Sequence, residues 1–254
     1  MGYELDFDSE CNKRLKALLG AYYDEKLAKV YMPVETITSD SEFAMTISCV
    51  PARKRVNEMD AGIRALLFNV IEHSKTGSRK IYVIDGERQN SALVGSLKTI
   101  EDSAVLNAVP RNAETITSTL EQIVASFSDI DDVLDNYDTV IEYNNSMPEE
   151  QKMQRSIIVI IGYPNAFEGV NKDYIKKILI NYERYGISFI AAQITSEAKG
   201  DNSRIGISEY AGEDIISIKM TSKDNTIKVG SAQEASFMWY SFKHKLKRSI
   251  YSVY

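Results

Sequence analysis

Three adjacent cations, Arg53, Lys54 and Arg55, stand between an apolar run and a helical pattern, where a phosphate-binding loop would lie. Such a loop reads GxxxxGK[ST] over eight residues, and Cys49 to Val56 has this length. Yet Cys49 and Lys54 occupy the two glycine positions. Arg55 stands at the lysine position, and Val56 at that of the hydroxyl that ligates Mg²⁺. Because glycines turn backbone N–H groups onto phosphate and valine has no oxygen, the segment predicts a nucleotide loop without its ordinary chemistry.

Two interpretations of Arg53, Lys54 and Arg55 stay open. Helix N-termini and basic side chains both attract anions, so the three cations could form a residual phosphate site. They could equally form a solvated basic loop, or pair with surface carboxylates. The first interpretation predicts weak binding of ATP and Mg²⁺ at Arg53–Val56.

A second group with chemical potential is Asp85, which ends the apolar run Lys80–Gly86. In a doubly wound sheet, ligands bind at the carboxyl ends of the strands, so Asp85 is a candidate member of the nucleotide cleft. The alternative is a plain turn, for which Asp-Gly is a common dipeptide.

The remaining polar groups predict no metal site. His73 has no second ligand nearby, and Asp129–Asp135 lacks the glycine and distal glutamate of a calcium loop. We interpret that acidic run as a solvated helix face. The basic stretch His244–Arg248 is interpreted as a solvated helix end, with DNA contact as the alternative.

Composition narrows the class of protein. The chain has 254 residues, 44% hydrophobic and 26% charged, with a net charge of −6 that argues against a polyanion-binding surface. Two cysteines, Cys11 and Cys49, support neither a disulfide framework nor a four-ligand zinc site, so a reducing compartment is expected. We find no apolar run long enough to span a bilayer and no signal peptide. The Met-Gly start suggests a fragment of a longer protein, with any membrane anchor outside it.

Apolar strands alternate with amphipathic helices along the chain, which predicts an α/β fold. Predicted strands are 43–50, 80–86, 103–107, 156–161 and 187–193; predicted helices are 9–29, 56–73, 112–127, 129–145 and 172–185; a hairpin is predicted at 215–220 and 226–230, and a helical or mixed segment at 232–248. Continuously apolar strands are typical of a parallel sheet covered on both faces. We therefore expect a doubly wound, mostly parallel sheet with helices on both faces and a C-terminal hairpin.

Three runs taken together resemble the FtsK/SpoIIIE family of P-loop motor domains. They are the loop Cys49–Val56, the strand Ile81–Gly86, and the pair Ile157–Ile161 with Ile187–Gln193. The resemblance covers residues 40–245 and implies a P-loop NTPase fold of RecA/FtsK type. Gln193 matches the family's sensor glutamine by position.

Within that family the chain looks most like the last, degenerate ATPase domain of the membrane-anchored coupling protein of type VIIb secretion systems. Residues 1–40 would then be a linker or helix from a preceding ATPase domain, and 41–254 the degenerate domain itself. The resemblance implies a cytoplasmic location for this part of a cell-membrane protein.

One departure from the family pattern bears directly on catalysis. The family's second acidic strand ends in Asp followed by Glu or Asn, which hold Mg²⁺ and polarise the attacking water. Here Gly162 and Tyr163 follow the strand. Loss of such groups costs orders of magnitude in rate, so we expect no catalytic residues and no autonomous ATPase activity.

The resemblance also implies partners. They are the neighbouring ATPase domain of the same chain, small helical secreted proteins of the Esx type, other effectors, and further copies in an oligomeric machine. Tyr163, Pro164 and Phe167 are candidates for a substrate pocket, because apolar side chains suit helix-in-groove binding, although ordinary packing explains them too. Alternatives are a weakly active ATPase that uses Arg55 and Asp85, and a DNA translocase module, against which the net charge counts.

Overall fold

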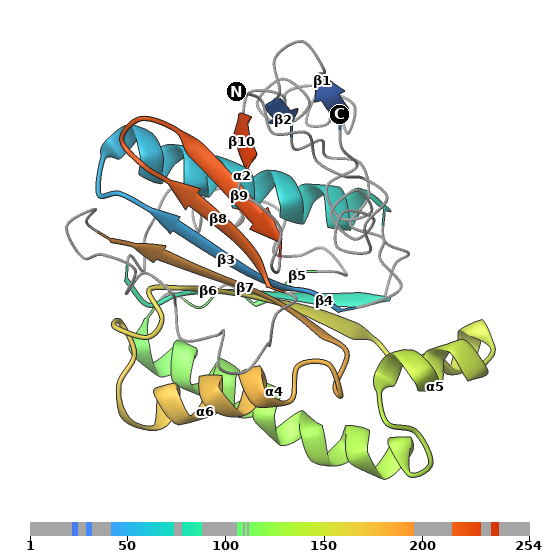
Figure 1. Ribbon diagram of the computed structural model, residues 1–254. Helices are drawn as coiled ribbons and strands as arrows, with labels where there is room; N and C mark the ends of the chain where they lie inside the picture. Colours follow the sequence, from blue (N-terminus) through green and yellow to red (C-terminus); the bar gives the residue numbers. More distant parts are fainter. Residues whose placement is uncertain are drawn as a thin grey trace, which may run out of the picture.

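The computed structural model describes residues 22–24, 29–31, 42–73, 78–87, 106–108, 110, 112–195, 215–229 and 235–238. A twisted sheet lies between two helical layers, with α2 on one face and α4 and α6 on the other (Figure 1). The strands are β1 (Tyr22–Asp24), β2 (Lys29–Tyr31), β3 (Ala44–Cys49), β4 (Arg79–Asp85), β5 (Leu106–Ala108), β6 (Arg155–Ile161), β7 (Ile187–Ile194), β8 (Ile216–Met220), β9 (Asn225–Val229) and β10 (Ala235–Met238). The helices are α2 (Arg53–His73), α4 (Ala113–Leu134), α5 (Val140–Ser146) and α6 (Gly169–Ile180), with a 3₁₀ turn at Glu149–Gln151.

The sheet order is β1-β2-β10-β9-β8-β3-β7-β6-β4-β5. Its six strands from β8 to β5 are parallel to one another, as the β3–β8, β3–β7, β6–β7, β4–β6 and β4–β5 pairings show. β8 and β9 form an antiparallel hairpin. The predicted mostly parallel sheet, its helices on both faces and the hairpin are therefore confirmed.

The apolar runs become the middle of the sheet. Residues 157–161 of β6 and 187–193 of β7 are all buried, because β6 and β7 have a strand on each side and helices over the sheet. A strand covered on both faces has no solvent side, so it needs no alternation of polar residues.

Helix α4 packs one stripe of apolar side chains against this sheet. Ile116, Leu120, Ile123 and Phe127 recur at helical spacing and belong to the core shared with α6, β6 and β7. The helix begins where the sequence predicts. The Asn112 side chain accepts a hydrogen bond from the Thr115 backbone N–H at 2.8 Å, and the Thr115 hydroxyl accepts one from the Asn112 N–H. This reciprocal pair satisfies donors that a helix N-terminus otherwise leaves open.

The far end of α4 is tied to the turn before β7. Asp131 accepts hydrogen bonds from Arg184 Nη2 and from the Tyr185 hydroxyl, both at 2.8 Å. These bonds, Arg184 first and Tyr185 second, lower the pKa of Asp131 below its usual value. The Tyr185 ring stacks on Phe127 with centroids 3.9 Å apart, so polar and apolar contacts hold the same corner.

Several predicted element boundaries were wrong. The helix continues past Asp129 as predicted, but it does not reach residue 145: α4 ends at Leu134, and a separate helix, α5, begins at Val140. Tyr22–Asp24 is a strand inside the predicted helix 9–29, and Lys29 at its end belongs to β2; the other residues of that predicted helix lie outside the described part. Ala235–Met238 is a strand inside the segment predicted as helical or mixed. Both strands extend the sheet by edge pairing, which a single-sequence pattern does not reveal.

None of the helices in the described part of the chain combines the length and the apolar character needed to span a membrane. β2 pairs with β10, so part of the predicted linker 1–40 joins the sheet, while the boundary at residue 40 stays a prediction.

Candidate functional site

The predicted site residues gather along one edge of the sheet, where the parallel strands end. Gln193 lies opposite Ser48 on β3, and Asp85 lies opposite Ile161, which precedes Gly162. The strand order from β3 to β4 places three strand spacings, about 14 Å, between Asp85 and the loop after Cys49. Asp85 is therefore on the same edge as Arg53–Val56 but too far away to share one phosphate group with it.

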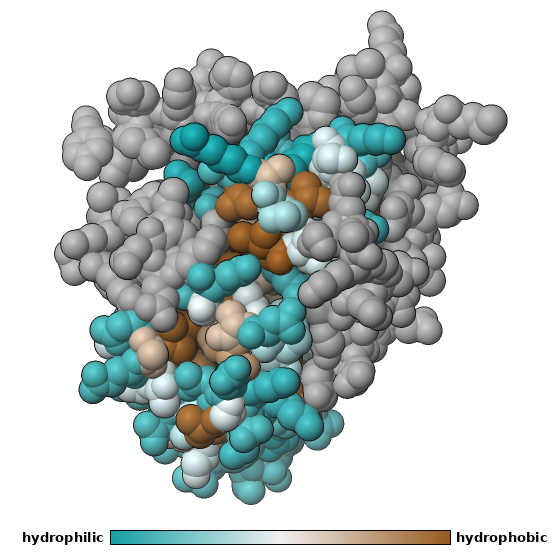
Figure 2. Space-filling model, turned by 90° about the vertical axis from the view of Figure 1, so that its left-hand side faces the viewer, coloured by the Kyte–Doolittle hydropathy of each residue, from teal (hydrophilic) through white to brown (hydrophobic). Residues whose placement is uncertain are grey.

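Figure 2 views this edge directly, because it faces the side to which β3, β7 and β8 point in Figure 1. Apolar side chains gather in the middle of the face, between hydrophilic ones. Ile194 at the end of β7 and Val56 in the first turn of α2 are half-buried apolar residues, and Arg53 and Lys54 are exposed cations. The edge thus combines an apolar centre with charged neighbours.

The connection from β3 to α2 is only Val50-Pro51-Ala52, since α2 begins at Arg53 and not at residue 56 as predicted. The Val50 N–H donates to the Met220 carbonyl at 3.1 Å, and the Ala52 N–H donates to the Val50 carbonyl at 2.7 Å. Pro51 has no N–H to donate. No N–H of these three residues is left to turn onto a phosphate, so the connection that precedes α2 offers no backbone donor.

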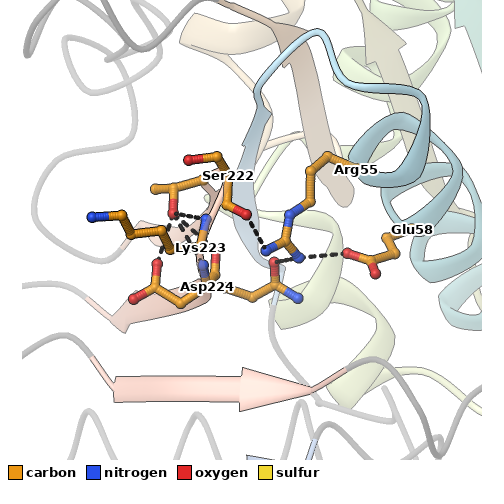
Figure 3. Close-up of polar contacts among 7 residues, drawn as sticks. Arg55, Glu58, Ser222, Lys223 and Asp224 are labelled. Carbon is orange, nitrogen blue, oxygen red and sulfur yellow. Dashed lines mark hydrogen bonds and ion pairs between the residues drawn. The ribbon is translucent and has the colours of Figure 1, made fainter.

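Arg55 differs from its two neighbours because its side chain is buried. Its Nη1 donates to Glu58 Oε2 at 2.7 Å and to Asn225 Oδ1 at 2.8 Å, and its Nη2 lies 3.4 Å from the Ser222 carbonyl (Figure 3). Only 9% of the Arg55 side chain and 16% of the Glu58 side chain is exposed. The guanidinium therefore joins the first turn of α2 to the hairpin β8–β9, and the structure fits the pairing interpretation better than a free phosphate-binding cation.

The turn that receives Arg55 is itself held by a side chain. The Thr221 hydroxyl accepts from the N–H groups of Lys223 and Asp224, at 3.2 and 3.1 Å, and donates to Asp224 Oδ1 at 2.7 Å. The Thr221 N–H donates to the Asp224 carbonyl at 2.9 Å. These bonds fix the direction of the Ser222 carbonyl that faces the Arg55 guanidinium.

Gly162 occupies a position that no larger residue fits. Its φ is +93°, and a Cβ added there would lie 2.7 Å from Ala166 Cβ and 3.0 Å from Glu87 Cβ. An L side chain rarely adopts this φ, and the contacts are shorter than real Cβ contacts. The backbone at the end of β6 is therefore built for glycine, so a carboxylate does not fit this position.

Tyr163 and Phe167 are core residues, each 4% exposed, and Pro164 is half-buried. The Phe167 ring lies over Gly86, where its nearest atom is 2.5 Å from the position of an added Cβ. The Phe167 side chain thus closes the ends of β4 and β6. Burial favours the packing interpretation of Tyr163 and Phe167, and their role in a substrate pocket stays a prediction.

Asp85 and Gln193 are both buried, with exposed fractions of 0% and 9%. Asp85 Oδ1 accepts from the Glu87 N–H at 3.1 Å, which is the geometry of an Asx turn. Gln193 precedes the point where the Thr195 N–H donates to the Cys49 carbonyl at 2.8 Å. These contacts show how the strand ends are held together, and leave the sensor role of Gln193 as a prediction.

Nucleotide and Mg²⁺ are the groups that this fold class implies, and the residues fit them poorly. The N–H groups of Val50 and Ala52 are used, the Val56 side chain has no oxygen, and Gly162 stands where a carboxylate would be needed. No group of three or more His, Cys, Asp or Glu residues in the described ranges is arranged to hold a metal ion. Arg53 and Lys54 at the α2 N-terminus remain the groups that would meet an anion.

Three residues of the Arg55 network were not predicted: Glu58, Ser222 and Asn225. The Arg55–Glu58 pair could have been found, since residues three apart are neighbours on a helix. The Arg55–Asn225 contact could not, because 170 residues separate its partners.

The fold is that of P-loop NTPase-like α/β domains. Comparison of the sequence with protein-family models gave no match, and neither did comparison with curated proteins. Comparison with solved structures did. The fold resembles EssC (ATPases 2 and 3) from Geobacillus thermodenitrificans, with a TM-score of 0.60 and 11% identity over 90% of this chain and 46% of that one.

Three further solved structures have a similar fold. The cytoplasmic domain of the Thermomonospora curvata type VII secretion ATPase EccC gives a TM-score of 0.60 at 10% identity, over 80% of this chain and 26% of that one. The pCW3 conjugation coupling protein TcpA, in a structure with ATPγS, gives 0.56 at 12% identity, over 84% and 65%. A second EccC structure, in complex with a signal sequence peptide, gives 0.55 at 12%, over 76% and 36%. The chain thus spans less than half the length of the EssC and EccC chains, and at these identities the likeness establishes the fold.

Proposed function

We propose that this chain is a non-hydrolysing ATPase-fold module of a type VII secretion coupling protein. It recognises or gates secreted protein substrates and regulates the ATPase domain next to it. The shared fold with EssC and EccC supports the secretion assignment. The observation that carries the loss of hydrolysis is Gly162, whose backbone and surroundings leave no room for the catalytic carboxylate.

The face at the strand ends is the candidate docking surface. Its apolar centre, next to Arg53 and Lys54, suits a helical peptide with apolar anchors and an acidic residue. EccC was solved with a signal sequence peptide bound, which supports a peptide ligand for the present chain as well. Small helical proteins of the Esx type are the substrate class proposed, with other effectors and further copies of the module as partners in a membrane-anchored machine.

The test begins with nucleotide. We would titrate the purified chain with Mg-ATP by calorimetry and measure phosphate release in parallel. The expected result is no release above the blank and weak or absent heat. Any heat should fall in Arg53→Gln/Lys54→Gln, whose exposed side chains leave the fold intact, and Glu114→Gln on α4 is the matched surface control. Turnover near 1 s⁻¹, ordinary for an enzyme, would overturn the proposal in favour of a working ATPase.

Peptide binding is tested separately by fluorescence anisotropy with labelled C-terminal segments of small helical secreted proteins. Binding that weakens in Arg53→Gln/Lys54→Gln supports docking at the strand ends. Equal binding by the wild type and the double variant would place the peptide elsewhere, and no binding to any segment would remove the recognition role.

A further inference from the structure

We propose that Arg55 is a relay residue: it transmits changes in the β8–β9 turn to the first turns of helix α2. The two elements are far apart in sequence, and one guanidinium contacts both at once. That the relay serves a partner seated at the strand ends rests on the proposed function, whereas the relay itself does not.

The N–H donors of the Arg55 guanidinium are divided between helix α2 and the β8–β9 hairpin. Nη1 reaches Glu58 on its own helix and Asn225 at the start of β9, and Nη2 faces Ser222 in the turn. Arginine holds its donors in one rigid plane, so a displacement of the turn must either break these bonds or move the helix end with it.

Burial makes breaking the bonds costly. The Arg55 side chain is 9% exposed and Asn225 is 7% exposed, so a charge that lost Asn225 would gain little compensation from water. Removing one partner of a buried charge is strongly destabilising, whereas moving both elements together keeps every bond. The turn and the helix end are therefore expected to move as a unit.

The exposed part of this unit is the turn. Ser222, Lys223 and Asp224 are exposed, and their conformation depends on the Thr221 hydroxyl. A contact that reshapes Thr221–Asp224 would redirect the Ser222 carbonyl and the start of β9, both of which face Arg55 (Figure 3). The β8–β9 turn is thus the input of the relay and the first turns of α2 are its output.

A double-mutant cycle tests the relay, because two sites are coupled only if a change at one alters the response of the other. Thr221→Ala loosens the turn without touching Arg55, and Arg55→Gln removes the bridge. Amide hydrogen exchange of residues 56–60, read by mass spectrometry without nucleotide, reports on α2. In wild type, Thr221→Ala should speed this exchange about fivefold or more, a typical size for coupling between sites.

In the Arg55→Gln background, Thr221→Ala should still speed exchange at residues 222–224 and no longer change it in α2. Asn225→Ala, which cuts the bridge but leaves the Arg55–Glu58 pair, should behave in the same way and serves if Arg55→Gln does not fold. Lys54→Gln, an exposed neighbour on the same turn, is the matched control and should leave the response intact.

Two results would overturn the relay: α2 exchange unaffected by Thr221→Ala in wild type, or affected equally with and without Arg55. Repeating the wild-type measurement with Mg-ATP separates the two proposals. Strong protection of α2 by nucleotide would contradict the weak or absent nucleotide binding expected of the proposed module and leave the Thr221–Arg55 coupling as measured.

Discussion

Arg55 carries a guanidinium with five N–H donors, and other residues of the chain accept hydrogen bonds from it. The residue type and its position at a helix start predict an anion site, yet Glu58 and Asn225 take the donors instead. Arg53 and Lys54, beside it in sequence, keep their side chains in solvent. Three cations of one run therefore have two different roles, decided by which way each faces on the helix.

Gly162 gives the sharpest prediction at the residue scale. Gly162→Ala forces a Cβ into φ +93° and to within 2.7 Å of Ala166, so we expect a loss of about 3 kcal/mol in the free energy of unfolding. Urea denaturation measures it. Gly162→Asp should be at least as unstable and should not gain phosphate release, although it restores the missing carboxylate in sequence.

Gly169 is the matched control for that prediction. Its φ of +55° is also positive, but no heavy atom other than those of its chain neighbours and its own helix backbone lies within 4 Å of an added Cβ. Gly169→Ala should therefore lose only the backbone term, about 1 kcal/mol. Equal losses for the two variants would show that crowding around Gly162 contributes nothing.

At the scale of elements, the segment that contains α4 and α5 carries only negatively charged side chains. Residues 112–151 include ten Asp or Glu and no Lys, Arg or His, and all ten are exposed. The last turn of α4 has no basic residue, although the negative end of a helix favours cations. Arg184 forms a salt bridge with one of these carboxylates, that of Asp131.

This arrangement predicts opposite effects for two substitutions on the same helix. Asp132→Lys, in the last turn, should stabilise the protein by about 0.5 kcal/mol at low salt, because it relieves repulsion and suits the helix end. Glu114→Lys, in the first turn, should destabilise it by a similar amount. Urea denaturation at low salt and in 1 M NaCl checks both, and effects that persist in high salt would contradict an electrostatic origin.

The sequence predicted elements with strong periodicity and missed those set by distant contacts. Ile157–Ile161 and Ile187–Gln193 were assigned as buried strands correctly, because only a covered sheet accommodates such apolar runs. The start of α2 was misplaced, because the eight-residue loop template was imposed on a connection of three residues. In the candidate site, the strand-end positions of Asp85 and Gln193 were predictable, whereas the Arg55–Asn225 bridge and the Phe167 ring over Gly86 depend on packing between elements.

At the scale of the whole molecule, β3 comes early in the chain and pairs with two strands that come late in it. It pairs with β7 on one side and β8 on the other, both in parallel. A chain that ends at residue 214 lacks β8 and leaves one edge of β3 open, so we expect it to aggregate. Size-exclusion chromatography with light scattering checks this, with the 254-residue chain as the control that keeps β8, β9 and β10. A monomeric 1–214 chain with cooperative unfolding would contradict it.

The position of β3 also has a consequence for synthesis. The Phe43 N–H pairs with Ser188, 145 residues later, and the Thr46 hydroxyl pairs with Ser217, 171 residues later. At about 5–20 residues per second, roughly 9 to 34 s pass on the ribosome between β3 and its second neighbour. For most of that time, until β7 has been made, the apolar strand β3 has neither of the two strands that it pairs with in the sheet. The nascent chain should therefore depend on chaperones that hold apolar segments until the last hairpin has emerged.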